Sequence, residues 1–376
     1  MAYRALFQNL KHFPGWHTGT KYVAFAVDDY GSIRTANKRA VEALKDRVSG
    51  FGGYMDYCDS VETREDLHML YEVLARHRDA QARRAVFTAY ALSANPDTDL
   101  MRREGRYAYE TLGETFARLA AEEPAAYEGI WLAWQEGMSE GLIRPQFHGR
   151  EHFSVPLIER KLERGDQDLK DNLEVASMSR LGGVPEMPGV AFNQAFSLHD
   201  EALLDQHREI IREGLALFEA TFGFASTTFT PPALKLHPSL DGFVAGLGVR
   251  SIDKPLSGQQ PAGGGKSRRS VNFLTPPKGA RLGKLVRTLS FEPCSGIKPD
   301  PVGQALREME VAFRWRKPVI ISSHRVNYAG HIDPANRKQG LAQLDQLLSD
   351  MLRRWPDIHF VSVDELVLIM EKGERE

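Results

Sequence analysis

Residues 22–31 read YVAFAVDDYG, an apolar run that ends in two adjacent aspartates and a glycine. The run Tyr22–Val27 has the β-branched, aromatic and small apolar side chains of a strand. Asp28 and Asp29 stand directly where this strand would end. In parallel α/β sheets and barrels, the carboxyl ends of the strands form the catalytic face. This stretch therefore predicts both a central strand and a place where functional side chains meet.

Six further short runs of the same kind predict strands, namely Ala85–Tyr90, Arg144–Phe147, Thr227–Phe229, Val249–Ile252, Val319–Ser322 and His359–Val361. Long amphipathic stretches separate them, and this alternation predicts βα units around a mainly parallel sheet. The fold class is therefore α/β.

Three of the amphipathic stretches show helical spacing of their apolar residues. The first follows residues 61–66 and has apolar positions from Leu67 to Leu74. The second is expected to begin at a Ser197 cap, to run through Phe218 and to stop at Gly223. The third is a leucine stripe over residues 341–352.

The length of 376 residues is compatible with one α/β barrel that carries insertions, and we expect a single domain over residues 1–376. Residues 100–143 read as a helical insertion beside the barrel. Residues 257–283, rich in Gly, Pro, Lys and Arg, predict a flexible surface loop.

Composition and charge exclude several classes of protein. The formal net charge is −2, so no overall field attracts nucleic acid or an anionic membrane. No run of about 18 apolar residues predicts a membrane span, and the N-terminus makes a poor signal peptide. We therefore expect a cytoplasmic protein with no nucleic-acid or membrane partner. Cys58 and Cys294, the two cysteines, are expected to be reduced.

Two other polar clusters also follow predicted strands directly. Residues 148–152, HGREH, follow the strand that ends at Phe147, and His324 follows the strand that ends at Ser322 with one serine between them. Residues at the carboxyl ends of parallel strands converge in space even when they are far apart in the sequence. We therefore expect the three clusters to form one site.

His148 and His152 are four residues apart, which on one helical turn would place both imidazoles on one face, able to bind one metal ion. With a carboxylate from the Asp28-Asp29 pair they make the ligand set of a catalytic zinc-type centre. The alternatives are a pair of ordinary histidines, and aspartates of which one caps a turn while the other is solvated.

His324 is a candidate general acid because imidazole changes charge near neutral pH, although alone it would be read as a structural histidine. Arg34, Arg150 and Arg325 lie within a few residues of these groups. They either orient carboxylates or bind an anionic part of the substrate, and ordinary salt bridges are the alternative.

These motifs resemble those of the polysaccharide deacetylase family, metal-dependent carbohydrate esterases that include chitin and peptidoglycan deacetylases. The segments that carry the resemblance are AVDDYG, HGREH and VIISSH, in this order, together with TFTPPALKLHPSLDGFVAGLGVRSID. The resemblance covers roughly residues 20–366. It implies a distorted (β/α) barrel of seven or eight strands and a carbohydrate substrate.

The resemblance also implies roles for individual residues. Asp29, His148 and His152 would hold one divalent metal ion, zinc in the first place and cobalt or nickel as alternatives. Asp28 would be the general base acting on metal-bound water, and His324 would protonate the leaving amine of an acetylated amino sugar. The residues expected to contact the substrate are Arg150, Arg325, Pro231 and Asn327.

The sequence departs from the family pattern in its middle motif. The family carries an arginine before the proline, paired with the base, and here Thr230 precedes Pro231. Arg325 or Lys235 is the expected replacement. We read the chain as a divergent member whose substrate is a soluble sugar precursor. Two alternatives stay open: an inactive carbohydrate-binding barrel, and a glycoside hydrolase using Asp28 and Glu151 as paired carboxylates.

Overall fold

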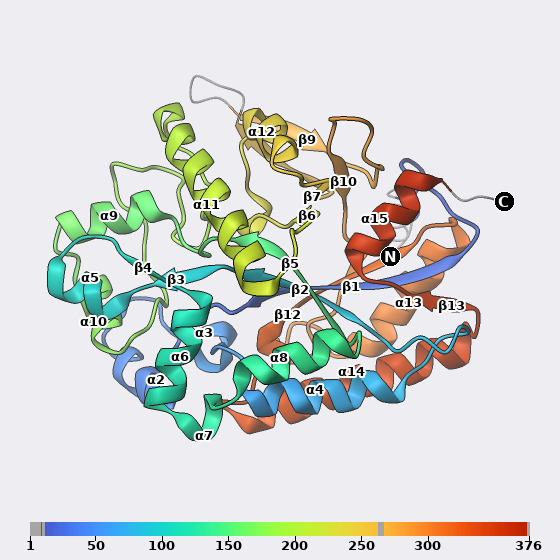
Figure 1. The fold of residues 1–376 in the computed structure, drawn as a ribbon, viewed down its shortest axis with the longest axis horizontal. Coiled ribbons are helices and arrows are strands. Elements are labelled where there is room, and N and C mark those ends of the chain that lie inside the picture. The colour runs from blue at the N-terminus through green and yellow to red at the C-terminus, as the bar shows by residue number, and fades with distance from the viewer. Residues whose placement is uncertain (1–8, 10–11, 262–266, 374–376) are drawn as a thin grey trace.

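A parallel sheet runs through the centre of the molecule (Figure 1). The computed structural model describes residue 9, residues 12–261 and residues 267–373. The strands of this sheet are β1 (Lys21–Tyr30), β2 (Phe87–Leu92), β5 (Ile143–Gly149), β6 (Thr228–Phe229), β7 (Ser251–Asp253), β10 (Gly283–Leu285), β11 (Leu289–Ser290), β12 (Val319–His324) and β13 (Ile358–Phe360).

One short segment joins the two edges of this sheet. The strand order is β10-β7-β6-β5-β2-β1-β12-β11, with β13 paired to the beginning of β1. β10 and β11 lie on one stretch of chain, residues 283–290, which pairs with β7 where it begins and with β12 where it ends. The sheet therefore curls round on itself, with its strands following chain order. The predicted distorted (β/α) barrel is confirmed.

All seven predicted strands are present, but several short strands of the structure were not predicted from the sequence. Besides β10 and β11, two antiparallel pairs were not predicted: β3 (Ala94–Pro96) with β4 (Tyr109–Thr111), and β8 (Ser257–Pro261) with β9 (Ser267–Val271). These strands have two to five residues and few apolar side chains, too short for a hydrophobic period to show.

Helices cover the sheet and also gather at one end of it. Figure 1 shows α4, α8 and α14 side by side beneath the strands, and α2, α3, α5, α6, α9 and α10 together on the left. The latter group follows β1, β2 and β5 at their carboxyl ends. The helices are α2 (Lys38–Leu44), α3 (Tyr54–Cys58), α4 (Arg64–Arg76), α5 (Thr98–Glu104), α6 (Leu112–Glu122), α7 (Pro124–Tyr127), α8 (Ile130–Ser139), α9 (Val155–Glu163), α10 (Gln167–Glu174), α11 (Leu204–Phe222), α12 (Asp241–Gly246), α13 (Pro301–Arg314), α14 (Pro334–Arg354) and α15 (Val363–Lys372).

The helix predicted after residue 63 and the one with the leucine stripe are confirmed as α4 and α14. The predicted Ser197 cap is wrong, because α11 begins only at Leu204. A 3-10 turn precedes α11, and the Asp200 side chain caps that turn by accepting from the backbone N–H of Ala202. The predicted stop is confirmed: Gly223 has φ +79°, the left-handed conformation that glycine adopts at helix ends.

The predicted insertion at residues 100–143 contains α6, α7 and α8 as well as strand β4. Within it, α8 packs against α4 and β5, so this helix belongs to the barrel's own layer. The predicted flexible loop at 257–283 contains the β8–β9 pair, and residues 262–266 lie outside the described residues. That the chain forms one domain stays a prediction.

Among the described residues, no helix combines the length and apolar character needed to cross a membrane. The prediction that the N-terminus makes a poor signal peptide rests on residues 1–19, of which residues 1–8, 10 and 11 lie outside the described residues, and it stays a prediction.

Alternate side chains of β1 enter two different apolar clusters, as the period of two in a strand requires. Val23, Phe25 and Val27 belong to the large core between the sheet and the covering helices. Ala24 and Ala26 belong to an inner cluster inside the barrel, which also contains side chains of β2, β12 and α15. Because both faces of β1 are buried, its register is fixed, and so is the position of the aspartates at its end.

Candidate metal centre

Asp29, His148 and His152 meet in a buried cluster at the carboxyl ends of β1 and β5. The Nε2 atoms of His148 and His152 lie 3.2 Å and 3.1 Å from Asp29 Oδ1. The three potential ligand atoms all lie within 4.8 Å of one another, and all three residues are buried. The structure thus brings together the three residues that the sequence predicted as metal ligands.

The backbone of β1 turns Asp29 toward this cluster. Asp28 continues the inward-facing series of Ala24 and Ala26, so an undisturbed strand would point Asp29 the opposite way. Instead, Asp29 has φ +73°, and the pairing of β1 with β2 shifts register between Val27 and Tyr30. This irregularity lets two adjacent carboxylates face one site, a use that β-bulges serve elsewhere.

The two histidines lie on a strand end and the bend that follows, not on the helical turn that we expected. His148 is the next-to-last residue of β5, and Gly149 after it has φ +141°. A Cβ atom at Gly149 would also lie 3.2 Å from the carbonyl oxygen of Glu151. The sharp turn at this glycine brings His152 back beside His148, with ring centroids 5.3 Å apart.

Hydrogen bonding fixes which nitrogen of His148 faces the cluster. Its Nδ1 lies 2.7 Å from the carbonyl oxygen of Thr230, which can only accept, so Nδ1 carries the proton. Nε2 therefore presents a lone pair to the cluster, as in many metal-binding histidines. The Nδ1 of His152 is buried and has no hydrogen-bond partner among the described residues.

The charge states of these residues suit a cation. Burial acts to raise the pKa of Asp29, but the imidazoles of His152 and His148 hold it well below its usual value. Burial lowers the pKa of His152 despite the opposing effect of the carboxylate. A carboxylate with two imidazoles is the donor set of a divalent metal of the zinc type. The residues present fit such an ion.

Asp28 is held by an arginine that the sequence did not indicate. Arg287 donates from Nη2 and Nη1 to the two oxygens of Asp28, at 2.6 Å and 2.7 Å, and from Nε to Asp253 Oδ2 at 2.6 Å. Burial favours the neutral guanidinium, but the two carboxylates raise the pKa of Arg287 well above its usual value. Our expectation that Arg325 or Lys235 replaces the motif arginine is therefore wrong, because Arg287 takes that place from the segment that closes the barrel.

His324 lies beside Asp28 and is paired with Glu292. Its Nδ1 is 2.7 Å from Glu292 Oε1, and its Nε2 is 3.9 Å from Asp28 Oδ2. Burial acts to lower the pKa of His324, but Glu292, Asp29 and Asp28 together raise it to about 10. The side-chain amide of Asn327 donates to the other oxygen of Glu292 at 2.5 Å and so fixes that carboxylate.

The two arginines predicted to bind substrate are both engaged in buried ion pairs. Arg150 bonds both oxygens of Glu151 and also pairs with Glu213. Arg325 pairs with Asp59 and Glu62, and its side chain is 1% exposed. These contacts favour the salt-bridge alternative. Of the other predicted contact residues, Pro231 is buried at the start of a 3-10 turn, and Asn327 is buried beneath His324.

The pairing of Glu151 also bears on glycoside cleavage. This side chain is buried, and both of its oxygens accept from Arg150. Paired-carboxylate chemistry needs a second carboxyl group that can reach the substrate. Glu151 is 1% exposed, against 7% for Asp28, so its burial disfavours this alternative.

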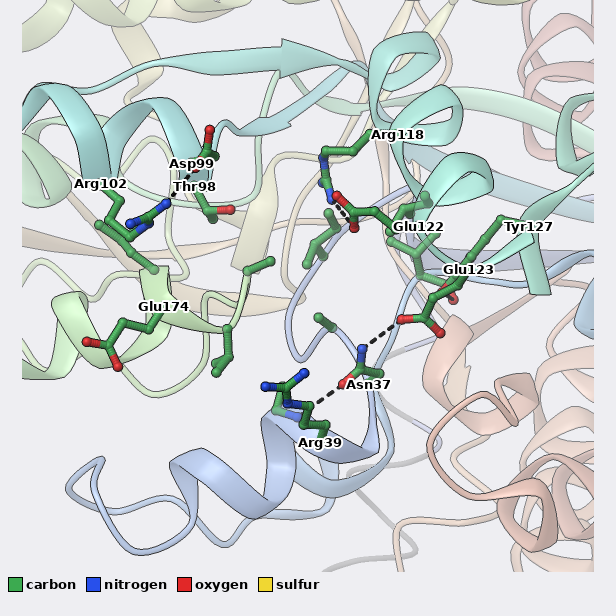
Figure 2. Close-up of a pocket in the computed structure, with 18 residues that line it drawn as sticks. Asn37, Arg39, Thr98, Asp99, Arg102, Arg118, Glu122, Glu123, Tyr127 and Glu174 are labelled. Carbon is green, nitrogen blue, oxygen red and sulfur yellow. Dashed lines mark hydrogen bonds and ion pairs between the residues drawn. The ribbon is translucent and has the colours of Figure 1, made fainter. Parts of the chain in front are cut away.

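Two cavities lie near this end of the barrel. One of about 740 Å³ adjoins His324 and Glu292. Figure 2 shows the other, of about 330 Å³, where Arg118 pairs with Glu122, Arg102 pairs with Asp99, and Asn37 bonds Glu123. None of the residues of the metal cluster lines this second cavity. None of them lines the first cavity either, but His324 and Glu292 do, so the first cavity is the one that adjoins the site.

Asp253, Arg287 and Glu292 are the site residues that the sequence analysis missed. Asp253 directly follows the predicted strand Val249–Ile252, so the strand-end argument could have found it. Arg287 and Glu292 follow β10 and β11, two strands that were not predicted. Without those strands, no sequence signal pointed to either residue.

Fold and site together define a class: an α/β barrel with a buried carboxylate–imidazole ligand set at the carboxyl ends of its strands. Comparison with known protein families and with curated proteins finds no match. Solved structures with a similar course of the chain include a Mycobacterium smegmatis protein named as a polysaccharide deacetylase, with 13% identity, a TM-score of 0.47 and coverage of 95% of this chain and 92% of that one.

Two further similar structures are named as a polysaccharide deacetylase and as an allantoinase. One is a probable polysaccharide deacetylase from Pseudomonas aeruginosa PAO1, with 10% identity, a TM-score of 0.46 and coverage of 95% of this chain and 93% of that one. The other is PuuE allantoinase, with 10% identity, a TM-score of 0.46 and coverage of 97% and 94%. At such scores the function has to be argued from the site itself.

Proposed function

We propose that this protein is a metal-dependent hydrolase that removes an acetyl group from the nitrogen of a sugar or a polysaccharide precursor. One divalent ion, zinc in the first place and cobalt or nickel as alternatives, is held by Asp29, His148 and His152. The observation that carries the proposal is the meeting of this ligand set with an arginine-bound carboxylate, Asp28, and a carboxylate-bound imidazole, His324.

A bound divalent ion would polarise the acyl carbonyl and acidify a water molecule. Asp28 is placed to accept a proton from an attacking water, because its carboxylate lies beside Asp29 and is oriented by the fork of Arg287. The guanidinium also offsets the repulsion between the adjacent carboxylates of Asp28 and Asp29, since two neighbouring negative charges repel each other without a counter-ion.

His324 supplies the proton that the departing nitrogen needs. Its Nδ1 bonds Glu292, which leaves Nε2 on the side of Asp28. With a pKa of about 10, the imidazole is protonated at neutral pH and can donate from Nε2. An amine is a poor leaving group unless it is protonated, so a base and an acid that lie side by side suit amide hydrolysis.

The alternative of an inactive carbohydrate-binding barrel rested on the absence of an arginine that pairs with the base. Arg287 supplies that contact from another part of the chain. The contacts of Arg287 and Glu292 therefore favour an enzyme.

The test is acetate release from N-acetylated sugars by the purified protein, before and after removal of metal with a chelator. We expect the activity to vanish in verified apoprotein and to return with zinc or cobalt. Metal content of the wild type and of His148→Ala/His152→Ala is measured in parallel, with about one ion per wild-type chain expected. Activity that persists in apoprotein, or a variant that keeps its metal, would contradict the proposal.

A further inference from the structure

The 740 Å³ cavity beside His324 contains two arginines that buried aspartates hold in place. Arg34 donates from Nε to Asp59 Oδ2 at 3.1 Å, and Arg180 donates from Nε to Asp56 Oδ2 at 2.8 Å. The two aspartate side chains are 1% and 2% exposed. Each guanidinium is therefore anchored at its inner edge, and its outer edge faces the cavity.

The outer nitrogens of both arginines are uncommitted. Among the described residues, no hydrogen bond or ion pair engages the Nη atoms of Arg34 or Arg180. A guanidinium fork with two free donors has the geometry that a carboxylate or a phosphate binds. Since the anchoring bond already restricts the side chain, an anion binding there loses little further side-chain freedom.

The carboxylates that line the same cavity are already satisfied. One oxygen of Glu292 accepts from His324 and the other from Asn327. Asp56 Oδ2 accepts from the backbone N–H groups of Gly52 and Gly53 in addition to Arg180. The cavity therefore offers free cationic donors, while its anions are occupied by protein groups. This asymmetry favours an anionic ligand over a cationic one.

The position of Arg180 is shaped by its surroundings. A Cβ atom at Gly53 would lie 2.5 Å from Nη2 of Arg180, so the guanidinium needs a glycine there. The backbone of Arg180 has φ +53°, a conformation that a non-glycine residue adopts at a cost. Both features direct this side chain, which is 48% exposed, along the wall of the cavity.

The remaining wall is largely apolar, with Met55, Leu181 and Phe192 among its residues. The volume lies within the range of roughly 300–1,000 Å³ that is usual for small-molecule sites. A compact ligand with one apolar face and one anionic group fits this combination better than a long neutral polymer.

We infer that the substrate is a small acylated compound that carries a carboxylate or a phosphate, bound by Arg34 and Arg180 while its amide reaches His324. The amide part of this inference rests on the proposed function, and the anionic part rests on the cavity alone. Arg34 and Arg180 are thus specificity-determining residues.

The test is calorimetric binding to chelator-treated full-length protein, so that it reads affinity without turnover. The probes are N-acetylglucosamine, its 6-phosphate, and N-acetylmuramic acid as the carboxylate-bearing analogue. We expect at least one charged probe to bind about tenfold or more tightly than the neutral sugar, the difference that a charge-assisted hydrogen bond supports. Which charged probe binds better decides between phosphate and carboxylate.

Arg180→Gln and Arg34→Gln are each expected to remove this preference. Gly53→Ala keeps the charge of Arg180 but displaces its guanidinium, so it should weaken the charged probes as well. Arg164→Gln is the matched control, because Arg164 pairs with Glu186 at a similar exposure of 45% but lies outside the cavity. Equal affinity for charged and neutral probes, or a preference unchanged in Arg180→Gln and Arg34→Gln, overturns the inference.

The two proposals can fail separately. Acetate release without any charge preference retains the proposed function and removes the anionic ligand. Charge-dependent binding that depends on Arg180, without release of acetate from any probe, retains the anion site and removes the proposed reaction.

Discussion

Replacing Arg287 by methionine tests whether one guanidinium holds the site together. This side chain is 10% exposed and bridges Asp28 on β1 and Asp253 on β7, whose side chains are 10% and 2% exposed. It also donates to the hydroxyl of Ser322 at 2.9 Å. Methionine has a similar length but no charge, so the variant leaves two buried carboxylates without their counter-ion.

The expected loss in the free energy of unfolding at pH 7.5 is about 3–5 kcal/mol, the usual cost of removing one partner of a buried ion pair. This is a large part of the roughly 5–15 kcal/mol that stabilises a typical domain. Burial already raises the pKa of Asp253 in the wild type, and without Arg287 the pKa of this carboxyl rises further. An acid whose folded pKa is raised destabilises the protein above that pKa, so the loss should shrink as the pH falls toward 4.

The assay is urea unfolding of wild type and variant at pH 7.5 and pH 5. Arg287→Lys, which keeps the charge but loses the fork, should lose less than Arg287→Met, and Arg287→Met/Asp253→Asn should recover part of the loss. Arg164→Met is the control, since its exposed pair with Glu186 contributes about 0–1 kcal/mol. A loss under about 1 kcal/mol in Arg287→Met, or a loss that is equal at both pH values, refutes the reasoning.

Three further predictions follow from buried or crowded positions. His207 is fully buried, neither of its ring nitrogens has a partner among the described residues, and burial, with His237, lowers its pKa to about 4. Because the unfolded chain binds this proton more readily, the wild type should lose up to about 3 kcal/mol between pH 6.5 and pH 4, and His207→Leu should not show that part of the loss in unfolding curves. Gly214→Ala in α11 should destabilise the protein by about 1–3 kcal/mol, because the added Cβ would lie 2.9 Å from the Cβ of Arg150. The control Gly242→Ala in α12 meets open space and should be neutral or slightly stabilising. Equal melting temperatures for the two variants would count against this packing argument. Asp29→Asn keeps the size of the side chain and tolerates the left-handed backbone, so it should fold but retain less metal than wild type after dialysis, as elemental analysis would report.

The fold was predictable from the sequence to the extent that its strands are long and apolar. Three of the seven predicted strands, Tyr22–Val27, Ala85–Tyr90 and Val319–Ser322, carry a run of apolar residues that has to be buried, and the structure places all seven in the sheet. The segment 283–290, GKLVRTLS, escaped prediction because it contains no run of more than two apolar residues and pairs over only three and two positions with its neighbours. Its role as the link between the sheet edges depends on contacts with β7 and β12, which a local pattern does not contain.

The candidate site was likewise predictable from the sequence only in part. The Asp28-Asp29 pair, His148 and His152 were predictable because they follow predicted strands whose ends converge, and the choice of Asp29 as the ligand came from the family resemblance. The partners of the reactive groups were not, since nothing in the sequence relates Arg287 to a carboxylate 259 positions away. Sequence proximity instead pointed to Arg325, which the fold uses in a buried pair with Asp59.

Closure of the barrel and assembly of the site depend on the same short segment. Its first part pairs with β7 and its last part with β12, and Arg287 stands between them. The guanidinium bonds a carboxylate at the end of β7 and another near the end of β1, so it joins neighbours of both sheet edges. The positive charge of Arg287, which orients Asp28 for its proposed role as a base, therefore also offsets the repulsion between the carboxylates of Asp28 and Asp253 at the strand ends. A change that frees this segment should open the barrel and disable the base together.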